Sequence, residues 1–400
     1  MAALRHRHFR IFYLGVLSGD FGIEMQVVAR GWLMYNITGS VFWLGIVTSA
    51  LGFSSFAVAP VGGLLADRMS KRTVMIAGRC AMAVDMALMG IGIWAGIISP
   101  WLLIGGTAIL GLSLGFSSPS RFAAVSQLVE PENLLNAVSL SSSTRNITRI
   151  AAPVLAGYMI RVWGADAAYL AIAMLYLSSA LVLLGLPTLP PPDRAAAPVR
   201  SSIWSDVGEG FRSIKSSATL SLLIAAAILS NGFGAPVNFL LPFFAEDILH
   251  VGPEGLGFLT SSAGVGSVLG LAFLASLGDY QHKGALLLAS IIGLGVGVVS
   301  FGFSTNYWLS FALLVPMGFA QTSQMVLNNT LLLANAPERV RGRVMSVFQM
   351  TGSTLSFTIV PMGALALLVG APIIVQFFGG ALLAGGILLT AATPVLRRLR

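Results

Sequence analysis

Long apolar runs follow one another almost from end to end of the chain, with short polar stretches between them. Each run approaches or exceeds the roughly 20 residues that an α-helix needs to cross a hydrocarbon layer. The runs are too long for the strands of a membrane barrel, and polar positions do not alternate within them. The pattern predicts twelve transmembrane helices, over 10–35, 42–66, 74–98, 102–124, 136–161, 167–188, 218–244, 255–278, 285–303, 308–333, 344–369 and 372–395.

One polar segment, 189–217, separates two sets of six predicted helices. Three prolines, Pro190, Pro191 and Pro192, break regular structure near its start, and 203–215 has the pattern of a short amphipathic helix. We therefore predict three parts: an N-terminal six-helix bundle over 1–188, a cytoplasmic linker over 189–217 and a C-terminal six-helix bundle over 218–400.

The composition places the chain in lipid. Of its 400 residues, 56% are hydrophobic and only 10% are charged, and the mean hydropathy is +0.85. A soluble globular protein of this size carries more polar surface. The net charge of +8 comes from small basic clusters between apolar runs rather than from one basic face, which argues against a nucleic-acid partner. We expect an all-α integral membrane protein.

Little in the sequence points to enzyme chemistry. Cys80 is the single cysteine, and the four histidines fall in predicted loops or termini, so we expect no metal site. The glycine-rich stretch 293–297 lies inside an apolar run and not between a strand and a helix, which favours close helix packing over a phosphate-binding loop. We expect no enzymatic activity and no cofactor.

Basic residues mark one side of the membrane. The opposite side has Arg161 alone, beside the acidic Glu246, Asp247 and Glu254. The positive-inside rule then places both termini in the cytoplasm, which also requires an even number of spans. The basic residues assigned to the cytoplasmic side are Arg5, Arg7, Arg10, Arg68, Lys71, Arg72, Arg121, Arg145, Arg149, Arg194, Arg200, Arg212, Lys215, Lys283, Arg339, Arg341, Arg343, Arg397, Arg398 and Arg400.

The two halves repeat. Segment 44–71 aligns without a gap with 256–283, which matches Asp67 with Asp279 and Lys71 with Lys283. An acidic and a basic residue four positions apart, at the end of a span in each half, do not recur readily by chance. Parallel repeats imply a pseudo-two-fold axis along the membrane normal, with a central cavity between the halves.

The segment from Gly63 to Arg72, Gly-Leu-Leu-Ala-Asp-Arg-Met-Ser-Lys-Arg, resembles the loop signature of the major facilitator superfamily, with Ser70 where the family usually has glycine. Segment 278–283 resembles a degenerate second copy. The resemblance implies a gating loop that latches one state of a transporter. The alternative is that these charges only set topology. The implied gating residues are Gly63, Asp67, Arg68, Lys71, Arg72, Asp279, Lys283 and, at the end of the fourth span, Arg121.

Further motifs resemble the enterobactin-exporter and macrolide-efflux branch of that superfamily. They include His8-Phe9-Arg10, Gly31-Trp32-Leu33 and Pro119-Ser120-Arg121. In the fifth span, Arg149, Pro153 and Gly157 resemble the Gly-Pro motif of antiporters, although two expected glycines are alanines here. The resemblance implies antiport, and the alternative is an ordinary packing helix bent by its proline.

Three carboxylates lie inside predicted spans, where they are costly and usually face a cavity or a partner. Asp20 and Glu24 are four apart and therefore share a helix face, and Asp85 lies near the middle of the third span. Burial favours the protonated form of a carboxylate. We therefore interpret all three as candidates for proton coupling. Arg30 and Arg79 can instead neutralise them, which would make them structural ion pairs.

Other polar and aromatic residues within the spans are candidates for lining a substrate cavity. Each has an ordinary alternative, because amides also join helices and aromatic rings also face lipid. These candidates are Gln26, Arg30, Arg79, Asn231, Asn238, Phe239, Gln324 and Asn328.

We expect a monomeric secondary transporter of a bacterial inner membrane whose partners are the lipid bilayer, protons and a small-molecule substrate. The favoured hypothesis is proton-coupled export of a siderophore or an amphipathic drug-like molecule by alternating access. The alternatives are an importer of a small metabolite and a non-transporting scaffold or receptor on the same fold. The charge of the cargo stays open, because acidic and basic candidates nearly balance.

Overall fold

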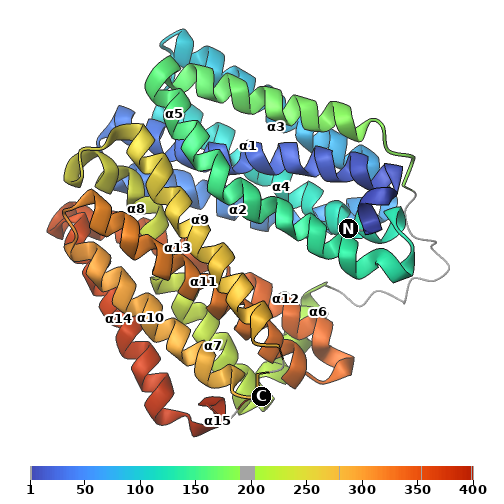
Figure 1. Ribbon diagram of the computed structural model, residues 1–400, viewed down its shortest axis with the longest axis vertical. Helices are drawn as coiled ribbons and strands as arrows, with labels where there is room; N and C mark the ends of the chain where they lie inside the picture. The colour runs from blue at the N-terminus through green and yellow to red at the C-terminus, as the bar shows by residue number, and fades with distance from the viewer. Residues whose placement is uncertain (1, 190–202, 279, 353, 398, 400) are drawn as a thin grey trace. The chain divides into compact units, whose positions relative to one another are not determined.

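The computed structural model describes residues 2–189, 203–278, 280–352, 354–397 and 399 (Figure 1). Side chains at 2, 59–61, 63–68, 122, 131, 135, 203–207 and 394–395 fall outside the described part, as do residues 190–202, which belong to the predicted linker. Within the described residues every element is helical and none is a strand. This fits a chain in lipid, where a helix satisfies its own backbone hydrogen bonds.

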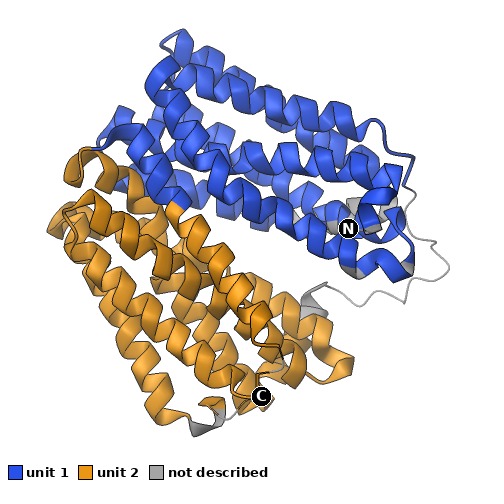
Figure 2. Ribbon diagram, viewed as in Figure 1, with its two compact units in different colours: residues 1–198, 251–261 blue, residues 199–250, 262–400 orange. Residues whose placement is uncertain are grey.

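The chain divides into two compact units, residues 1–198 with 251–261 and residues 199–250 with 262–400 (Figure 2). Helix α9 therefore begins in unit 1 and ends in unit 2. Unit 1 otherwise contains η1 (Ala2–Arg5), α1 (Arg7–Thr38), α2 (Val41–Arg68), α3 (Lys71–Trp94), α4 (Pro100–Leu128), η2 (Pro131–Asn133) and α5 (Leu134–Leu183).

Unit 2 is also helical throughout its described residues. Its first long helix is interrupted at Gly234, after which the chain resumes as α8 and a π-helical turn. The elements are α6 (Ile203–Ser216), α7 (Ala218–Phe233), α8 (Val237–Phe243), η4 (Phe244–Ile248), α9 (Gly252–Ser276), α10 (Lys283–Phe303), α11 (Tyr307–Asn335), η5 (Glu338–Val340), α12 (Arg341–Thr351), α13 (Thr354–Val369), α14 (Ala371–Ala392) and α15 (Pro394–Arg397).

Ten helical stretches in the described part are long and apolar enough to cross a membrane. The chain is therefore a multi-pass membrane protein. Helix α5 counts once among the ten, although it is 50 residues long and its backbone leaves helical geometry at Gly164 (φ 91°, ψ 167°). The backbone stays helical through Pro153, so the break falls at the glycine and not at the proline. Gly164 lies between two predicted spans.

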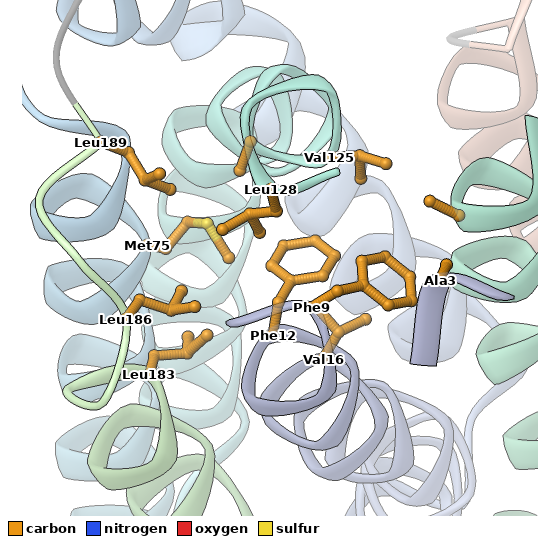
Figure 3. Close-up of a cluster of buried hydrophobic side chains, with 12 residues drawn as sticks. Ala3, Phe9, Phe12, Val16, Met75, Val125, Leu128, Leu183, Leu186 and Leu189 are labelled. Atoms are coloured by element: carbon orange, nitrogen blue, oxygen red, sulfur yellow. The ribbon is translucent and has the colours of Figure 1, made fainter. Parts of the chain in front are cut away.

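An apolar cluster fills one end of unit 1 (Figure 3). It gathers the start of α1, the start of α3, the end of α4 and both ends of α5. Phe9, Phe12 and Val16 of α1 lie at its centre and are almost wholly buried. The positive-inside rule predicted that these helix ends lie on one common side of the membrane. The remaining members are Ala3, Met75, Ala124, Val125, Leu128, Ala137, Leu183, Leu186 and Leu189.

Glycines let several helices approach closely, as is common in membrane proteins. In the stretch 293–297, a Cβ added at Gly295 would lie 2.8 Å from the backbone nitrogen of Leu383 in α14. A Cβ at Gly293 would meet nothing within 4 Å. Close helix packing, as the sequence indicated, thus accounts for Gly295 but not for Gly293.

We expect Gly295→Ala to lower the midpoint of thermal unfolding of the purified protein in detergent, because the added methyl group pushes α10 away from α14. Overpacking of this kind costs about 1–3 kcal/mol. Gly293→Ala is the matched control, and its midpoint should stay or rise because alanine favours a helix over glycine. A Gly295→Ala midpoint equal to that of the control would contradict the packing argument.

Candidate functional site

The interior face of α1 alternates glycines with buried polar side chains. Gly15, Gly19 and Gly22 recur every three or four residues and therefore share one face. A Cβ at Gly15 would lie 2.9 Å from Leu183, and one at Gly22 would lie 2.9 Å from Tyr176. Large side chains of α5 thus reach the backbone of α1, and the polar residues of this face lie inside unit 1.

Asp20 binds three donors at this face. Arg121 of α4 donates from Nη1 to Asp20 Oδ1 over 2.7 Å and from Nη2 to Oδ2 over 2.9 Å. The hydroxyl of Thr144 in α5 donates to Oδ2 over 2.8 Å. Asp20 is 2% exposed and the Arg121 side chain 13%. A two-pronged guanidinium–carboxylate pair of this kind is among the stronger hydrogen-bonded arrangements in proteins.

Glu24 lies one turn beyond Asp20 on α1 and is half-buried. It interacts electrostatically with Arg149 and Arg145 of α5, and it is repelled by Asp20. The two carboxylates that the sequence placed on one helix face therefore have different basic partners, Arg121 for Asp20 and the α5 arginines for Glu24. Neither Arg30 nor Arg79, the partners considered from the sequence, forms an ion pair with them among the described residues.

Three further charged side chains lie inside unit 1: Asp85 of α3, which lies against Gly106 of α4, and Arg30 of α1 and Arg79 of α3, which both interact electrostatically with Tyr176 of α5. All three are buried, with exposed fractions of 4%, 5% and 8%. A Cβ added at Gly19 would overlap the Arg79 guanidinium carbon, so the Arg79 guanidinium lies directly on the α1 backbone. Gln26, also buried, accepts a long hydrogen bond of 3.4 Å from Arg30.

In the loop signature, the side chains of Asp67 and Arg68 fall outside the described residues, and Gly63 is described only as part of the α2 backbone; Asp279 falls outside entirely. The last two members of the signature, Lys71 and Arg72, begin α3 and form hydrogen bonds to the segment that follows α5. The Lys71 backbone N–H donates to the Leu189 carbonyl over 3.1 Å, and Arg72 Nη2 donates to the Leu184 carbonyl over 2.6 Å. Lys283 begins α10 in unit 2. Arg121, the remaining gating candidate, binds Asp20 within the bundle.

The fifth-span motif lies at a close helix crossing within unit 1. A Cβ added at Gly157 of α5 would overlap the Pro253 carbonyl oxygen, and a Cβ at Gly257 of α9 would lie 2.5 Å from that of Pro153. The two glycines thus leave room for each other's helix. An ion pair between Arg161 and Glu254 flanks this crossing.

Two cavity candidates of unit 2 join helices. Asn231 Nδ2 in α7 donates to Thr351 Oγ1 at the end of α12 over 3.2 Å. Asn328 Nδ2 in α11 donates to the Leu223 carbonyl of α7 over 3.0 Å, while its Oδ1 has no partner in the described part. These bonds suit the alternative interpretation, in which the amides hold helices together.

The other candidates of unit 2 differ in exposure. Gln324 and Phe239 are buried, with exposed fractions of 4% and 8%. Asn238 is exposed and donates to the Ala235 carbonyl one turn before it over 3.3 Å. In the residues that the structure describes, histidines, cysteines and carboxylates form no group of three able to hold a metal ion.

Three residues of the unit 1 interior were missed at the sequence level: Thr144, Tyr169 and Tyr176, all of α5. Both tyrosines are fully buried, and Arg79 lies 5.8 Å from the centre of the Tyr176 ring. A signal was available, because residues seven apart lie on one face of a helix and a pair of tyrosines on one face of a membrane span is a polar feature. Thr144 gave no such signal.

A family model described as Transmembrane secretion effector matches residues 1–398. Curated relatives include the enterobactin exporter EntS of Shigella flexneri, which is 26% identical over 402 residues, 99% of this chain and 94% of that protein. EntS of Escherichia coli O1:K1 is 25% identical over 405 residues, with the same shares covered.

Solved structures share the fold at lower identity. A mutant form of the nucleoside transporter NupG matches with a TM-score of 0.77 and 15% identity over 96% of this chain and 99% of its own. A POT family transporter in complex with a thioalcohol-conjugated peptide matches with a TM-score of 0.79 and 11% identity over 98% and 96%. At these identities the match is one of fold.

We expect Asp20→Asn to lower the midpoint of thermal unfolding strongly, because it leaves the Arg121 guanidinium without its counter-charge. Removing one partner of a buried pair costs about 3–5 kcal/mol. Adding Arg121→Gln to this variant should restore part of the loss. The control is Arg161→Gln, which breaks a pair whose arginine side chain is 65% exposed and should cost at most about 1 kcal/mol. Equal midpoints for Asp20→Asn and the control would refute a burial cost at Asp20.

Proposed function

Because the chain belongs to the Transmembrane secretion effector family of the major facilitator superfamily, and is therefore a transporter and not an enzyme, we propose that it exports a small molecule by proton-coupled alternating access. The cargo class that we propose is a siderophore or an amphipathic drug-like molecule. The first of these is supported by curated relatives that are named enterobactin exporters. We place the chain as a monomer in a bacterial inner membrane.

The observation that carries the proton coupling is the arrangement at Asp20. A carboxylate inside a membrane bundle is costly and marks a proton relay or a transport pathway by default. In this proposal, a proton on Asp20 removes the charge that both prongs of Arg121 bind, which weakens the link between α4 and α1. Deprotonation restores the pair. Asp20 thus has two states whose difference is a link between two helices, which is what a coupled transporter requires.

Glu24 is the second carboxylate of this proposal. It shares the α1 face with Asp20 and lies next to arginines of the fifth-span motif. A proton that leaves Asp20 changes the charge one turn from Glu24, so the protonation states of the two carboxylates depend on each other. Asp85 is the third candidate, on α3.

The proposal includes twelve spans in two six-helix bundles, over 1–188 and 218–400, joined by a cytoplasmic linker and with both termini in the cytoplasm. Helix α5 supports this count, because 50 residues at 1.5 Å each extend about 75 Å, more than twice the roughly 30 Å hydrocarbon layer. Its break at Gly164 suits two crossings. Helix α11, with 29 residues, is long enough for one more.

We assign the gating role to the loop signature, whose members are Gly63, Asp67, Arg68, Lys71, Arg72, Asp279 and Lys283. The bonds of Lys71 and Arg72 to the end of α5 support this role, because they couple the start of α3 to the segment that leads into the linker.

The proposal is tested with purified protein in liposomes that contain a pH-sensitive dye, challenged with a panel of siderophores and amphipathic drugs. We expect a cargo-dependent proton flux in the unmodified protein that Asp20→Asn abolishes and Glu24→Gln reduces at least about tenfold, as loss of a proton-transfer group typically does. Glu130→Gln, at an exposed carboxylate, is the control and should leave the flux intact.

Two results would go against this function. Cargo that moves to the cytoplasmic side together with the protons would make the chain an importer. Cargo binding without any flux, and with both variants equal to the control, would indicate a receptor or scaffold and would make the carboxylates structural.

A further inference from the structure

Unit 1 buries more positive charge than its acidic residues compensate. Arg121 takes the Asp20 carboxylate, and Glu24 faces the arginines of α5. Arg30 and Arg79 stay within the same bundle at 5% and 8% exposure, and neither forms an ion pair in the described chain. Arg79 is attracted by the Asp20 charge, but both oxygens of that carboxylate already bind Arg121. A buried guanidinium without an ion-pair partner lowers the stability of the bundle, so its presence points to a function.

The contacts of these two arginines are weak for their ten N–H donors. The bonds recorded for them within the described residues are one of 3.4 Å from Arg30 Nη1 to Gln26 Oε1 and one of 3.8 Å from Arg79 Nη1 to the Met82 sulfur. Arg79 also lies over the Tyr176 ring, 5.8 Å from its centre. Neither arginine therefore uses the two-pronged geometry for which this side chain is suited.

Two phenols lie in the same group. Tyr169 and Tyr176 are fully buried, and neither hydroxyl has a hydrogen-bond partner among the described residues. Tyr169 interacts electrostatically with Arg30, and Tyr176 with both arginines. Buried hydroxyls are nearly always hydrogen-bonded, and leaving one unsatisfied costs about 1–3 kcal/mol. The phenols and guanidiniums thus form one cluster of unused donors.

Acceptors are scarce in this cluster. Asp85 interacts with both tyrosines, and one of its oxygens, Oδ2, is buried without a partner in the described part. Its single negative charge offsets one of the two guanidinium charges at most. What the cluster lacks is a negatively charged oxygen acceptor, such as a carboxylate or an ionised phenol. A cationic cargo would find no uncommitted carboxylate other than Asp85 among the described residues here.

From this excess of donors we infer that Arg30, Arg79, Tyr169 and Tyr176 bind an acidic oxygen group of the cargo, and that the cargo is an anion. The inference rests on the proposed transport function and adds the charge of the cargo, which the sequence left open. The arginines supply the charge, Tyr169 and Tyr176 donate from the α5 side, and Gly19 leaves the space in which the Arg79 guanidinium lies.

The test is equilibrium binding to the full-length protein in lipid nanodiscs, measured with two matched pairs of probes. Salicylate is compared with salicylamide, and 1-naphthoate with 1-naphthamide. The two members of a pair share size and ring system, and the amide replaces the carboxylate charge and one acceptor oxygen with a neutral NH2 group. We expect each acid to bind at least about tenfold more tightly than its amide, the preference expected when a hydrogen bond to a charged group is lost. Equal binding of acid and amide, or no binding of either acid, would overturn the inference.

Variants locate the site. Arg30→Gln and Arg79→Gln should each remove the preference for the acid, and Tyr176→Phe, which keeps the ring beneath Arg79, should weaken acid binding several-fold while leaving the amide unchanged. Arg161→Gln, at an arginine that already has Glu254 as a partner, is the matched control and should keep the preference. If a glutamine variant does not fold, Tyr176→Phe and Arg79→Lys decide. Variants that keep the full preference would place acid binding elsewhere and refute the site.

Binding at equilibrium needs no proton movement, which separates this inference from the proposed function. Acid preference lost in Arg79→Gln, in a protein that shows no cargo-dependent proton flux, would support the anion site and reject the coupling. Proton flux driven by a cationic cargo, with no acid preference, would support the coupling and reject the anion site.

Discussion

An ionised carboxylate inside a membrane bundle is stabilised by a cation in contact with it, and the guanidinium of Arg121 supplies that cation for Asp20. The pair fixes α4 against α1, and the Thr144 hydroxyl adds α5 to the same point. Three helices that lie far apart in the sequence therefore share one charged contact. The apolar cluster of Phe9, Phe12 and Val16 lies one turn and more before Asp20 on α1, which separates this contact from the helix ends.

The rest of the polar interior follows from how that contact is satisfied. Because Arg121 binds Asp20 directly, neither Arg30 nor Arg79 forms an ion pair with a carboxylate among the described residues, although the Asp20 charge also acts on Arg79. In one part of the interior, around Asp20 and Arg121, hydrogen-bond donors and acceptors match. In the other part, around Arg30 and Arg79, hydrogen-bond donors are in excess. In our proposals, the first part links the helices and responds to protons, and the second part binds the cargo.

Much of this arrangement could be predicted, since few backbone conformations satisfy all backbone hydrogen bonds in lipid. The apolar runs predicted the membrane helices because a backbone without water must satisfy its own hydrogen bonds. The four-residue spacing of Asp20 and Glu24 predicted their common face. The partner of Asp20 could not be predicted, because Arg121 lies about a hundred positions away and its contact depends on how α1 packs against α4. For the same reason, the sequence suggested Arg30 and Arg79 as neutralising groups. Sequence spacing identifies residues that are near one another along a helix, but it does not identify contacts between helices.

Gly19 has a consequence for how transport specificity can change over generations. Its missing side chain is the room in which the Arg79 guanidinium rests, so replacement by alanine or serine would displace a cation without altering any charge in the chain. In the proposed anion site, substrate range can therefore change through the volume of the residue at position 19. Comparisons of relatives that track only acidic and basic residues would overlook such a change, whereas the residue at position 19 would record it.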